Sequence, residues 1–250
     1  MKNIKFVLQY EGTRYDGWQK QGNTGNTIQG KLEAILSRMD GREVEIHGSG
    51  RTDAGVHAHG QVANAKLESS KKVQEIKEYM NTYLPKDIVV VEAEEVSMRF
   101  HSRLLAVSKT YRYRIRTGKD RDVFSRNFVW HLGKTLDLFS MQKAAKELVG
   151  THDFLAFSSM KKGKKSTVRT LTSIDIRQVG EEVYLTFNGN GFLYHMVRIL
   201  TGTLVEIGLG QRNPEEIREI FESQDRKKAG QMAPAQGLAL MSVQYEPKKT

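Results

Sequence analysis

Hydrophobic positions in the first part of the chain repeat with two different periods. Some apolar runs are rich in β-branched residues or alternate with polar residues, which is typical of strands, and others recur every three or four residues, which is typical of helices. The predicted strands are residues 3–10, 43–47, 61–67 and 88–91. The predicted helices are residues 28–39, with Asn26 or Thr27 as N-cap, and 73–84, which Pro85 ends. Strands and helices are therefore interleaved.

The second part of the chain carries the same mixture of periods. Its predicted strands are residues 110–116, 174–179, 183–188 and 238–245. Its predicted helices are residues 136–149, 192–207 and 214–223. Several adjacent strands are joined by short turns, so we expect an α+β fold with largely antiparallel sheets flanked by helices. We expect two similar halves, residues 1–105 and 106–250.

Composition and charge limit the classes of protein to which this chain can belong. The 250 residues carry a net charge of +10, which favours polyanionic partners such as nucleic acid. The chain has no cysteine, which excludes disulfides and thiolate-bound zinc. No apolar run approaches the roughly 18 residues of a membrane span, and the apolar start of the chain is too short for a signal peptide. We therefore expect a cytoplasmic protein that does not contact a membrane.

Part of the positive charge is concentrated in one loop around Gly163. Its lysines are Lys161, Lys162, Lys164 and Lys165. We expect them to contact phosphates, because the glycine lets the loop bend around an RNA backbone; the alternative is a solvated loop. Phe154 and Phe157, just before the loop, would either stack on RNA bases or anchor the loop to the core.

A glycine-rich stretch between two predicted strands carries a candidate acid. Residues 47–60 contain four glycines, more than a hairpin turn needs, which indicates a close approach of another backbone or several positive φ angles. Arg51 and Asp53 lie at its centre. An arginine beside an aspartate keeps the carboxylate ionised, as a nucleophile or base requires. The alternative is a structural ion pair that stabilises the turn.

His57 and His59 offer a different interpretation of the same stretch. In a strand they share one face, and with Asp53 they would supply three metal ligands, as in a metal-dependent RNA nuclease. No second cluster of ligands is evident, so no metal is expected. A phosphate-binding loop is disfavoured because its Gly-x-x-x-x-Gly-Lys-Ser/Thr pattern is missing. A non-catalytic RNA-binding module is the third possibility.

Short motifs follow one another in a fixed order along nearly the whole chain. They lie at residues 10–19, 50–57, 99–103, 111–113, 192–198 and 237–238. In this order they resemble the tRNA pseudouridine synthase A (TruA) family, whose opening segment usually has Asp where this chain has Glu11. The resemblance runs from about residue 4 to about residue 245.

The resemblance implies an enzyme that isomerises uridine to pseudouridine at positions 38, 39 and 40, in the anticodon stem-loop of tRNA. It implies a homodimer with tRNA lying across both subunits and no further protein partner. It also implies an active-site cleft between the two halves. Because the product is an isomer of the substrate, we expect no cofactor.

The resemblance also implies roles for individual residues. Asp53 would be the catalytic nucleophile, with Arg51 and Arg198 as supporting cations. Arg51 would also help to displace the flipped base. Tyr111 and Leu238 would bind the uracil, Tyr111 by stacking and Leu238 as an apolar cover. By residue type alone, a tyrosine or leucine in a strand is usually a core residue.

Two neighbouring pairs bear on these roles. Tyr113 points the same way as Tyr111 in a strand, so we expect one of the two to be a core residue. His195 and Arg198 are three residues apart in the predicted helix 192–207, so we expect them to share a face.

Overall fold

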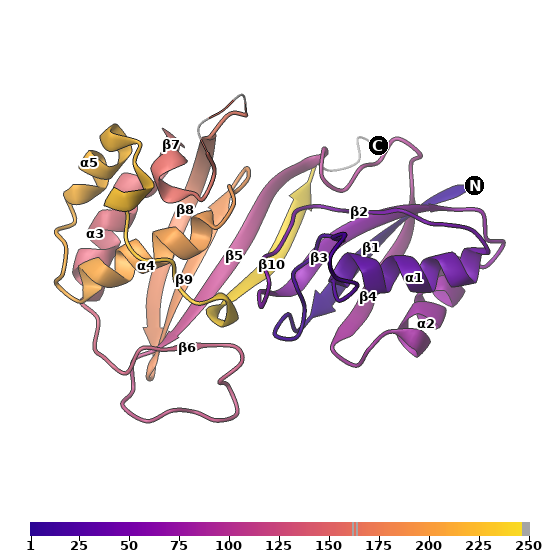
Figure 1. Ribbon diagram of the computed structural model, residues 1–250, viewed down its shortest axis with the longest axis horizontal. Coiled ribbons are helices and arrows are strands. Elements are labelled where there is room, and N and C mark those ends of the chain that lie inside the picture. Colours follow the sequence, from indigo (N-terminus) through magenta and orange to yellow (C-terminus); the bar gives the residue numbers. More distant parts are fainter. Residues whose placement is uncertain (162, 164, 247–250) are drawn as a thin grey trace. The chain divides into compact units, whose positions relative to one another are not determined.

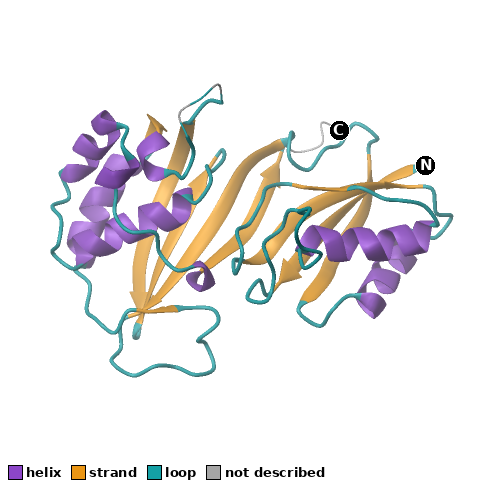
Figure 2. Cartoon of the chain, in the orientation of Figure 1, coloured by secondary structure: helices purple, strands orange, loops and turns teal. Residues whose placement is uncertain are grey.

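A computed structural model, which describes residues 1–161, 163 and 165–246, has the expected α+β fold (Figure 1). The chain divides into two compact units, and each contains both strands and helices (Figure 2). One unit holds the residues up to Val107 together with those from Ala239 onward, and the other holds Ser108–Leu238. The first division lies close to the boundary expected near residue 105.

The first unit is a mainly antiparallel sheet with two helices. Its elements are β1 (Lys2–Tyr10), α1 (Ile28–Asp40), β2 (Ile46–Gly48), β3 (His57–Leu67), α2 (Val73–Tyr83), β4 (Ile88–Val96) and β10 (Leu238–Tyr245). The strand order is β4-β1-β3-β10, with β2 paired to β3. Ile4, Phe6 and Leu8 of β1 are fully buried, so the period-two pattern of the sequence marks the core face. Of the two predicted N-caps of α1, Thr27 accepts the bond from the Gly30 N–H.

The closing strand β10 belongs to the first unit although it follows the second unit in sequence. It runs parallel to β3, with Ala239 opposite His57 and Leu240 opposite Ala58. The sequence predicted the span of this strand and placed it with residues 106–250. Its alternating pattern carries no information about which strand becomes its partner.

The second unit is a sheet with helices packed beside it (Figure 1). Its strands are β5 (Ala106–Arg116), β6 (Trp130–His131), β7 (Gly150–Asp153), β8 (Val168–Val179) and β9 (Glu182–Gly189). Its helices are α3 (Leu138–Leu148), α4 (Met196–Gly208) and α5 (Glu216–Ser223), with short 3-10 helices η1 (Leu155–Phe157), η2 (Arg226–Lys228) and η3 (Ala235–Gly237). The order β5-β9-β8-β7 is antiparallel throughout, and β6 pairs parallel to β5. The short strands β6 and β7 were not predicted, because two to four residues are too few to establish a period.

α4 is the buried helix of the second unit, and nearly all its residues lie in the core. The sequence predicted a helix from residue 192, but α4 begins at Met196 because His195 has a φ of 62°, outside the helical region. The expectation that His195 and Arg198 share a helical face is therefore wrong, since only Arg198 lies in the helix. None of the helices in the described ranges has both the length and the apolar character that a membrane crossing requires.

The loop after β1 packs backbone against backbone on the glycine-rich loop between β2 and β3. The Trp18 N–H donates to the Thr52 carbonyl oxygen at 3.0 Å. A Cβ atom at Gly12 would lie 1.9 Å from the Val56 carbonyl oxygen, a distance that no side chain can tolerate. Glycine at position 12 is therefore a condition for the contact between these two loops.

Gly12→Ala tests this contact. The added methyl group must push the two loops apart, so we expect the free energy of unfolding to fall by about 3 kcal/mol, the upper end of the usual cost of overpacking. Gly22→Ala, in the same loop, is the matched control, because nothing lies within 4 Å of its Cβ position. Urea unfolding followed by circular dichroism measures both changes. Equal stability of the two variants would contradict the prediction.

Candidate active site

Asp53 lies in a tight turn within the loop between β2 and β3. The Val56 N–H donates to the Asp53 carbonyl oxygen at 3.1 Å, and Gly55, the third residue of the turn, has a φ of 78°. A positive φ at this position is the mark of a type II turn and favours glycine. The Gly55 N–H donates to the Tyr15 carbonyl oxygen at 3.3 Å. The backbone that carries the half-buried Asp53 side chain is therefore tied down both within the turn and from outside it.

Polar contacts to β3 fix the start of the same loop. The Ser49 N–H donates to the Val62 carbonyl oxygen at 2.7 Å, and the Ser49 hydroxyl donates to Gln61 Oε1 at 2.7 Å. The Gln61 amide Nε2 donates to the Gly50 carbonyl oxygen at 3.0 Å. Ser49 and Gln61 are fully buried, where an unpaired polar group would be costly. Sequence reasoning missed both residues, because β3 carries several other polar residues and nothing in its pattern marks Gln61 as buried.

A buried tyrosine lies against Thr52. The Tyr10 hydroxyl and Thr52 Oγ1 are 2.8 Å apart. Burial raises the pKa of Tyr10 to about 12, so its hydroxyl stays neutral at physiological pH. Thr52 is buried, whereas Arg51 is exposed and Asp53 is half-buried. The loop thus turns one residue into the core and leaves the two charged residues beside it accessible.

Arg51 is held by the opening motif of the chain. Its Nε donates to Gln19 Oε1 at 3.0 Å, and Gln19 is the last residue of the motif 10–19. The two most distinctive motifs of the sequence, residues 10–19 and 50–57, therefore pack on each other. They place Arg51 and Asp53 in one loop, as predicted.

The glycines around Asp53 make room for other parts of this chain. A Cβ at Gly48 would lie 2.4 Å from the Trp18 ring, and a Cβ at Gly60 would lie 2.4 Å from the Met241 carbonyl oxygen. The sequence predicted positive φ angles or the close approach of another backbone. Gly55 has the positive φ, and at Gly48 and Gly60 the neighbours are a side chain and a backbone of the chain itself.

His57 and His59 differ in their surroundings. His57 is buried and its Nδ1 accepts the Gly12 N–H at 3.0 Å, while His59 is exposed. In the part of the chain that the structure describes, no group of three or more His, Cys, Asp or Glu residues is arranged to hold a metal ion. Asp53, His57 and His59 thus do not form a three-ligand group in the described residues, and the His57 ring is part of the contact between the two loops.

In the second unit the two tyrosines of β5 have different roles. Tyr113 is fully buried and its hydroxyl donates to the Pro234 carbonyl oxygen at 2.6 Å. Burial raises the pKa of Tyr113, so the hydroxyl remains a donor. Tyr111 lies opposite Phe187 of β9. The rings of Tyr111 and Phe192 pack edge to face, with their centroids 5.0 Å apart. Both tyrosines are buried, Tyr113 completely and Tyr111 with 7% of its surface exposed, so Tyr113 is the more deeply buried of the two.

Arg198, in the first turn of α4, is tied to an irregular segment by two bonds. Its Nε donates to the Ala233 carbonyl oxygen at 2.8 Å, and the Ala233 N–H donates to the Arg198 carbonyl oxygen at 3.0 Å. The next residue, Pro234, accepts the Tyr113 hydroxyl. Residues 233–234 thus connect α4 to β5, a link that sequence reasoning missed because nothing in this segment is periodic.

Leu238 follows the same segment and is 5% exposed. The residue before it, Gly237, must be glycine, because a Cβ there would lie 2.5 Å from Tyr113 Cε1. Within the second unit, the residues expected at the site are therefore linked through Tyr113: Tyr111 two residues along β5, Arg198 through Ala233 and Pro234, and Leu238 through Gly237.

The basic loop is described only in part. Lys161 and Lys165 are exposed, whereas Lys162 and Lys164 lie outside the described residues. Phe154 and Phe157 are fully buried and pack on Phe221, with ring centroids 5.3 and 5.0 Å away. These two phenylalanines therefore anchor the loop to the core and do not offer rings to RNA.

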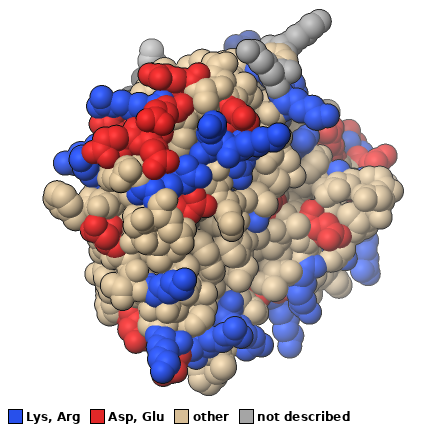
Figure 3. Space-filling model, turned by 60° about the vertical axis from the view of Figure 1, so that its left-hand side comes forward, with Lys and Arg blue, Asp and Glu red and all other residues tan. Residues whose placement is uncertain are grey.

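Positive charge on the surface is spread over several places. The face in Figure 3 carries Lys and Arg in several separate groups, with a group of Asp and Glu among them. Many described cations are paired, as Arg212 is with Glu206 and Arg218 with Glu147. The net charge therefore does not by itself identify one binding face.

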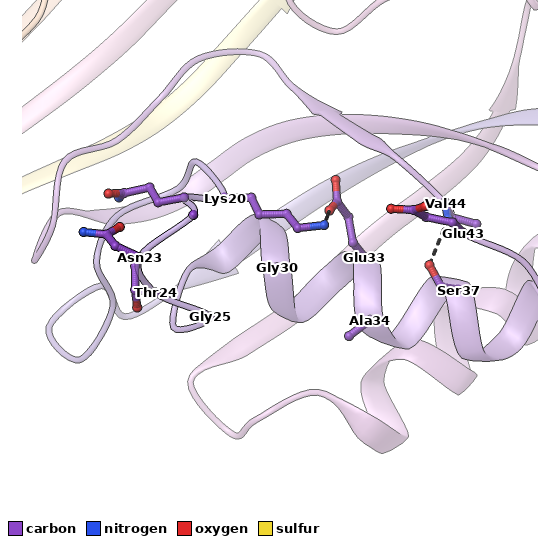
Figure 4. A pocket seen from close by; sticks show the side chains of 12 residues that line it. Lys20, Asn23, Thr24, Gly25, Gly30, Glu33, Ala34, Ser37, Glu43 and Val44 are labelled. Carbon is purple, nitrogen blue, oxygen red and sulfur yellow. Dashed lines mark hydrogen bonds and ion pairs between the residues drawn. The ribbon is translucent and has the colours of Figure 1, made fainter.

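A pocket of about 600 Å³ in the first unit contains none of the predicted site residues. It lies between the loop 20–25 and α1 (Figure 4), and its lining includes an ion pair between Lys20 and Glu33 at 3.2 Å. Ser37 Oγ in the same lining accepts the Val44 N–H at 2.9 Å. Lys20 and Glu33 thus satisfy each other's charge, and no residue of the Asp53 loop lines the pocket.

Comparison with known proteins places the chain in a family. A family model described as tRNA pseudouridine synthase matches residues 7–103 and 144–246. A tRNA pseudouridine synthase A from Bacillus sp. (strain KSM-64) is 50% identical over 245 residues, which cover 98% of this chain and 100% of that protein. A tRNA pseudouridine synthase A 2 from Clostridium tetani is 46% identical over 248 residues, which cover 98% and 99%.

Among solved structures, an archaeal box H/ACA sRNP Nop10–Cbf5 complex aligns with a TM-score of 0.37 and 12% identity, covering 81% of this chain and 44% of that chain. The assignment rests on the sequence matches, which span nearly the whole chain and include the segments that carry Arg51, Asp53 and Arg198. The chain belongs to the tRNA pseudouridine synthase A (TruA) family.

Proposed function

We propose that this chain converts uridine to pseudouridine at positions 38, 39 and 40 of tRNA, in the anticodon stem-loop. As a member of its family it is a tRNA pseudouridine synthase, an isomerase. The observation that carries the proposal is the full-length match to that family together with Asp53 on a turn that the backbone holds in place.

The reaction breaks the N1–C1′ bond of uridine, turns the base and joins C5 to C1′. No group is added or lost, so the chemistry requires no cofactor. It requires a carboxylate near the ribose or the base, a surface that holds the detached uracil, and a group that removes the C5 proton.

Asp53 is the proposed catalytic carboxylate and nucleophile. Its turn is fixed by the bond from the Val56 N–H to the Asp53 carbonyl oxygen and by the bond from the Gly55 N–H to the Tyr15 carbonyl oxygen, so the carboxylate needs little reorganisation when substrate arrives. The exposed side chain of Arg51 lies in the same loop and is proposed to displace the target base and to orient Asp53. Extruding a base costs a few kcal/mol, least where pairing is already weak, as it is close to a loop.

Tyr111, Arg198 and Leu238 are the proposed partners from the second unit. Tyr111 would stack on the uracil and assist proton removal, and its ring is braced by Phe192. Arg198 would supply a cation to the catalytic aspartate, from a position fixed by Ala233. Leu238 would cover the uracil with an apolar side chain. These roles rest on the motifs in which the residues stand.

The proposed tRNA substrate also bears on the compartment and the oligomeric state in which the chain acts. We place it in the cytoplasm with its tRNA, as a homodimer with tRNA lying across both subunits. Helical RNA is recognised by shape and phosphates more than by sequence, which suits an enzyme with several target positions.

Mapping pseudouridine in tRNA tests the proposed positions. Cells that lack this protein should have uridine at positions 38, 39 and 40, and the wild-type gene should restore pseudouridine there. Sequencing after carbodiimide treatment locates the modified bases. Full modification of these positions without the protein would overturn the proposal.

Asp53→Asn tests the carboxylate. The change keeps the size of the side chain and removes its charge, so turnover should fall below detection while tRNA binding persists, because binding rests on contacts spread over many phosphates. Tritium release from labelled tRNA measures turnover, and filter binding measures affinity. Asp175→Asn, which removes the same charge from an exposed position of β8, is the control and should keep normal turnover. Near-normal activity of Asp53→Asn would exclude Asp53 as the nucleophile.

The basic loop is tested by changing Lys161, Lys162, Lys164 and Lys165 together to Ala. Each lost phosphate contact should remove about 0.7 to 0.9 from the slope of log K against log salt. KM should rise while kcat stays close to normal, because these contacts bind the substrate and the transition state equally well. The control is the tail pair Lys248 and Lys249 changed to Ala. If both variants weaken binding equally per lysine, the loop has no special role.

A further inference from the structure

His195 has an unfavourable backbone conformation directly before α4. Its φ and ψ are 62° and 3°, in the left-handed region, whereas a residue that precedes a helix normally has an extended backbone. Among the described residues, Gln224 is the one other non-glycine residue with positive φ, and it ends α5, where this conformation is common. Strain of this kind persists where the surroundings impose it, and it gathers at functional sites.

Two contacts fix the strained residue. The His195 ring stacks on the Tyr194 ring, with centroids 3.6 Å apart and planes 29° from parallel. Its Nδ1 is 2.8 Å from Ser159 Oγ, and the Ser159 N–H donates to the Tyr194 carbonyl oxygen at 3.0 Å. The left-handed conformation of His195 is thus coupled to an ordered pair of rings.

This pair of rings is accessible from solvent. Tyr194 is 56% exposed and His195 is half-buried. An aromatic ring that is already backed by a second ring loses little freedom when a flat ligand stacks on it. The bases of single-stranded RNA bind to aromatic side chains of proteins in this way.

The loop that carries the rings is tied to β8 by a backbone bond and contacts the proposed substrate-binding tyrosine through Phe192. The Asn190 N–H donates to the Thr170 carbonyl oxygen at 3.0 Å, and the Phe192 ring contacts Tyr111. Tyr194 is two residues beyond Phe192, so its backbone lies within about 7 Å of that residue along the chain. A base next to one that stacks on Tyr111 would lie at a comparable distance.

Two cations lie on segments that neighbour the exposed rings. Lys161 is exposed and follows Ser159 by two residues. A Cβ atom added at Gly191 would lie 3.5 Å from Arg169 Nε. β8 begins and β9 ends at the same end of the sheet, so the segments that carry these cations and the rings leave the sheet together (Figure 1). Phosphates of a nucleotide bound at the rings would meet positive charge.

We propose that Tyr194, backed by His195, is a stacking site for an unpaired RNA base that neighbours the target uridine. The proposal rests on the proposed function and adds a binding site to it. Extrusion of the target leaves an adjacent base without its stacking neighbour, and this base would stack on Tyr194 and stabilise the opened RNA. Tyr194 and His195 are binding residues and take no part in the bond changes.

The test uses anticodon stem-loop RNAs in which 2-aminopurine replaces one base on either side of the target uridine. Stacking on an aromatic ring quenches its fluorescence, so we expect quenching by the wild-type protein at one of the two positions. Tyr194→Ala should abolish this quenching and weaken binding of the stem-loop about tenfold, as the loss of one stacked base does. Tyr194→Phe should keep both, because it keeps the ring.

His195→Gly separates binding from a purely structural role. Glycine adopts positive φ without strain, so this variant should melt no earlier than wild type while binding the stem-loop more weakly. Phe139→Ala, at a 79% exposed position of α3, is the control and should change neither quantity. Should Tyr194→Ala prove unstable, Tyr194→Leu, which keeps apolar bulk without an aromatic ring, takes its place.

Wild-type protein that quenches neither probe, or a Tyr194→Ala variant that binds and quenches like wild type, would overturn the proposal. Pseudouridine formation in the unlabelled stem-loop is measured alongside. Absence of that product with wild-type protein would count against the proposed function, whereas its formation without quenching would count against the stacking site alone.

Discussion

The contact between Gly12 and the Val56 carbonyl is the constraint on which the Asp53 loop depends. The loop has no regular secondary structure, so its backbone groups need partners from elsewhere. They find them in the loop after β1, through Trp18 and Tyr15, and the two loops can approach only because position 12 has no side chain. A charged side chain is thereby placed by a network of backbone bonds.

The second unit uses the same means with different residues. Its irregular segment 233–237 is tied to α4 through Ala233 and to β5 through the Tyr113 hydroxyl at Pro234. Gly237 allows that segment to pass against the Tyr113 ring. In each unit, therefore, a glycine at a point of closest approach and a buried tyrosine hydroxyl hold an irregular segment that carries a site residue.

Strain in the second unit is local and has an identifiable cause. His195 shortens the predicted helix by turning into the left-handed region, and in exchange its ring stacks on Tyr194 and bonds to Ser159. A regular helix through residue 192 would have carried these rings around the helix surface. The break keeps Phe192 on Tyr111 and leaves Tyr194 exposed.

The sequence by itself determined the α+β class, the existence and approximate places of the longer strands and helices, and the motifs that identify the family. It could do so because periodicity, N-caps such as Thr27 and a continuous motif around Asp53 are properties of neighbouring residues. Motif matching likewise singled out Arg51, Asp53, Tyr111, Arg198 and Leu238 as candidates.

Only the tertiary structure decided that the Tyr113 hydroxyl donates to Pro234, that His57 accepts a bond from Gly12, and that β10 pairs with β3. The same holds for the start of α4, which follows His195, whose ring contacts Ser159. Each of these outcomes is set by a partner far away in the chain. A local pattern records that a residue is apolar or polar, but it does not record which distant group will fill its surroundings or satisfy its hydrogen bond.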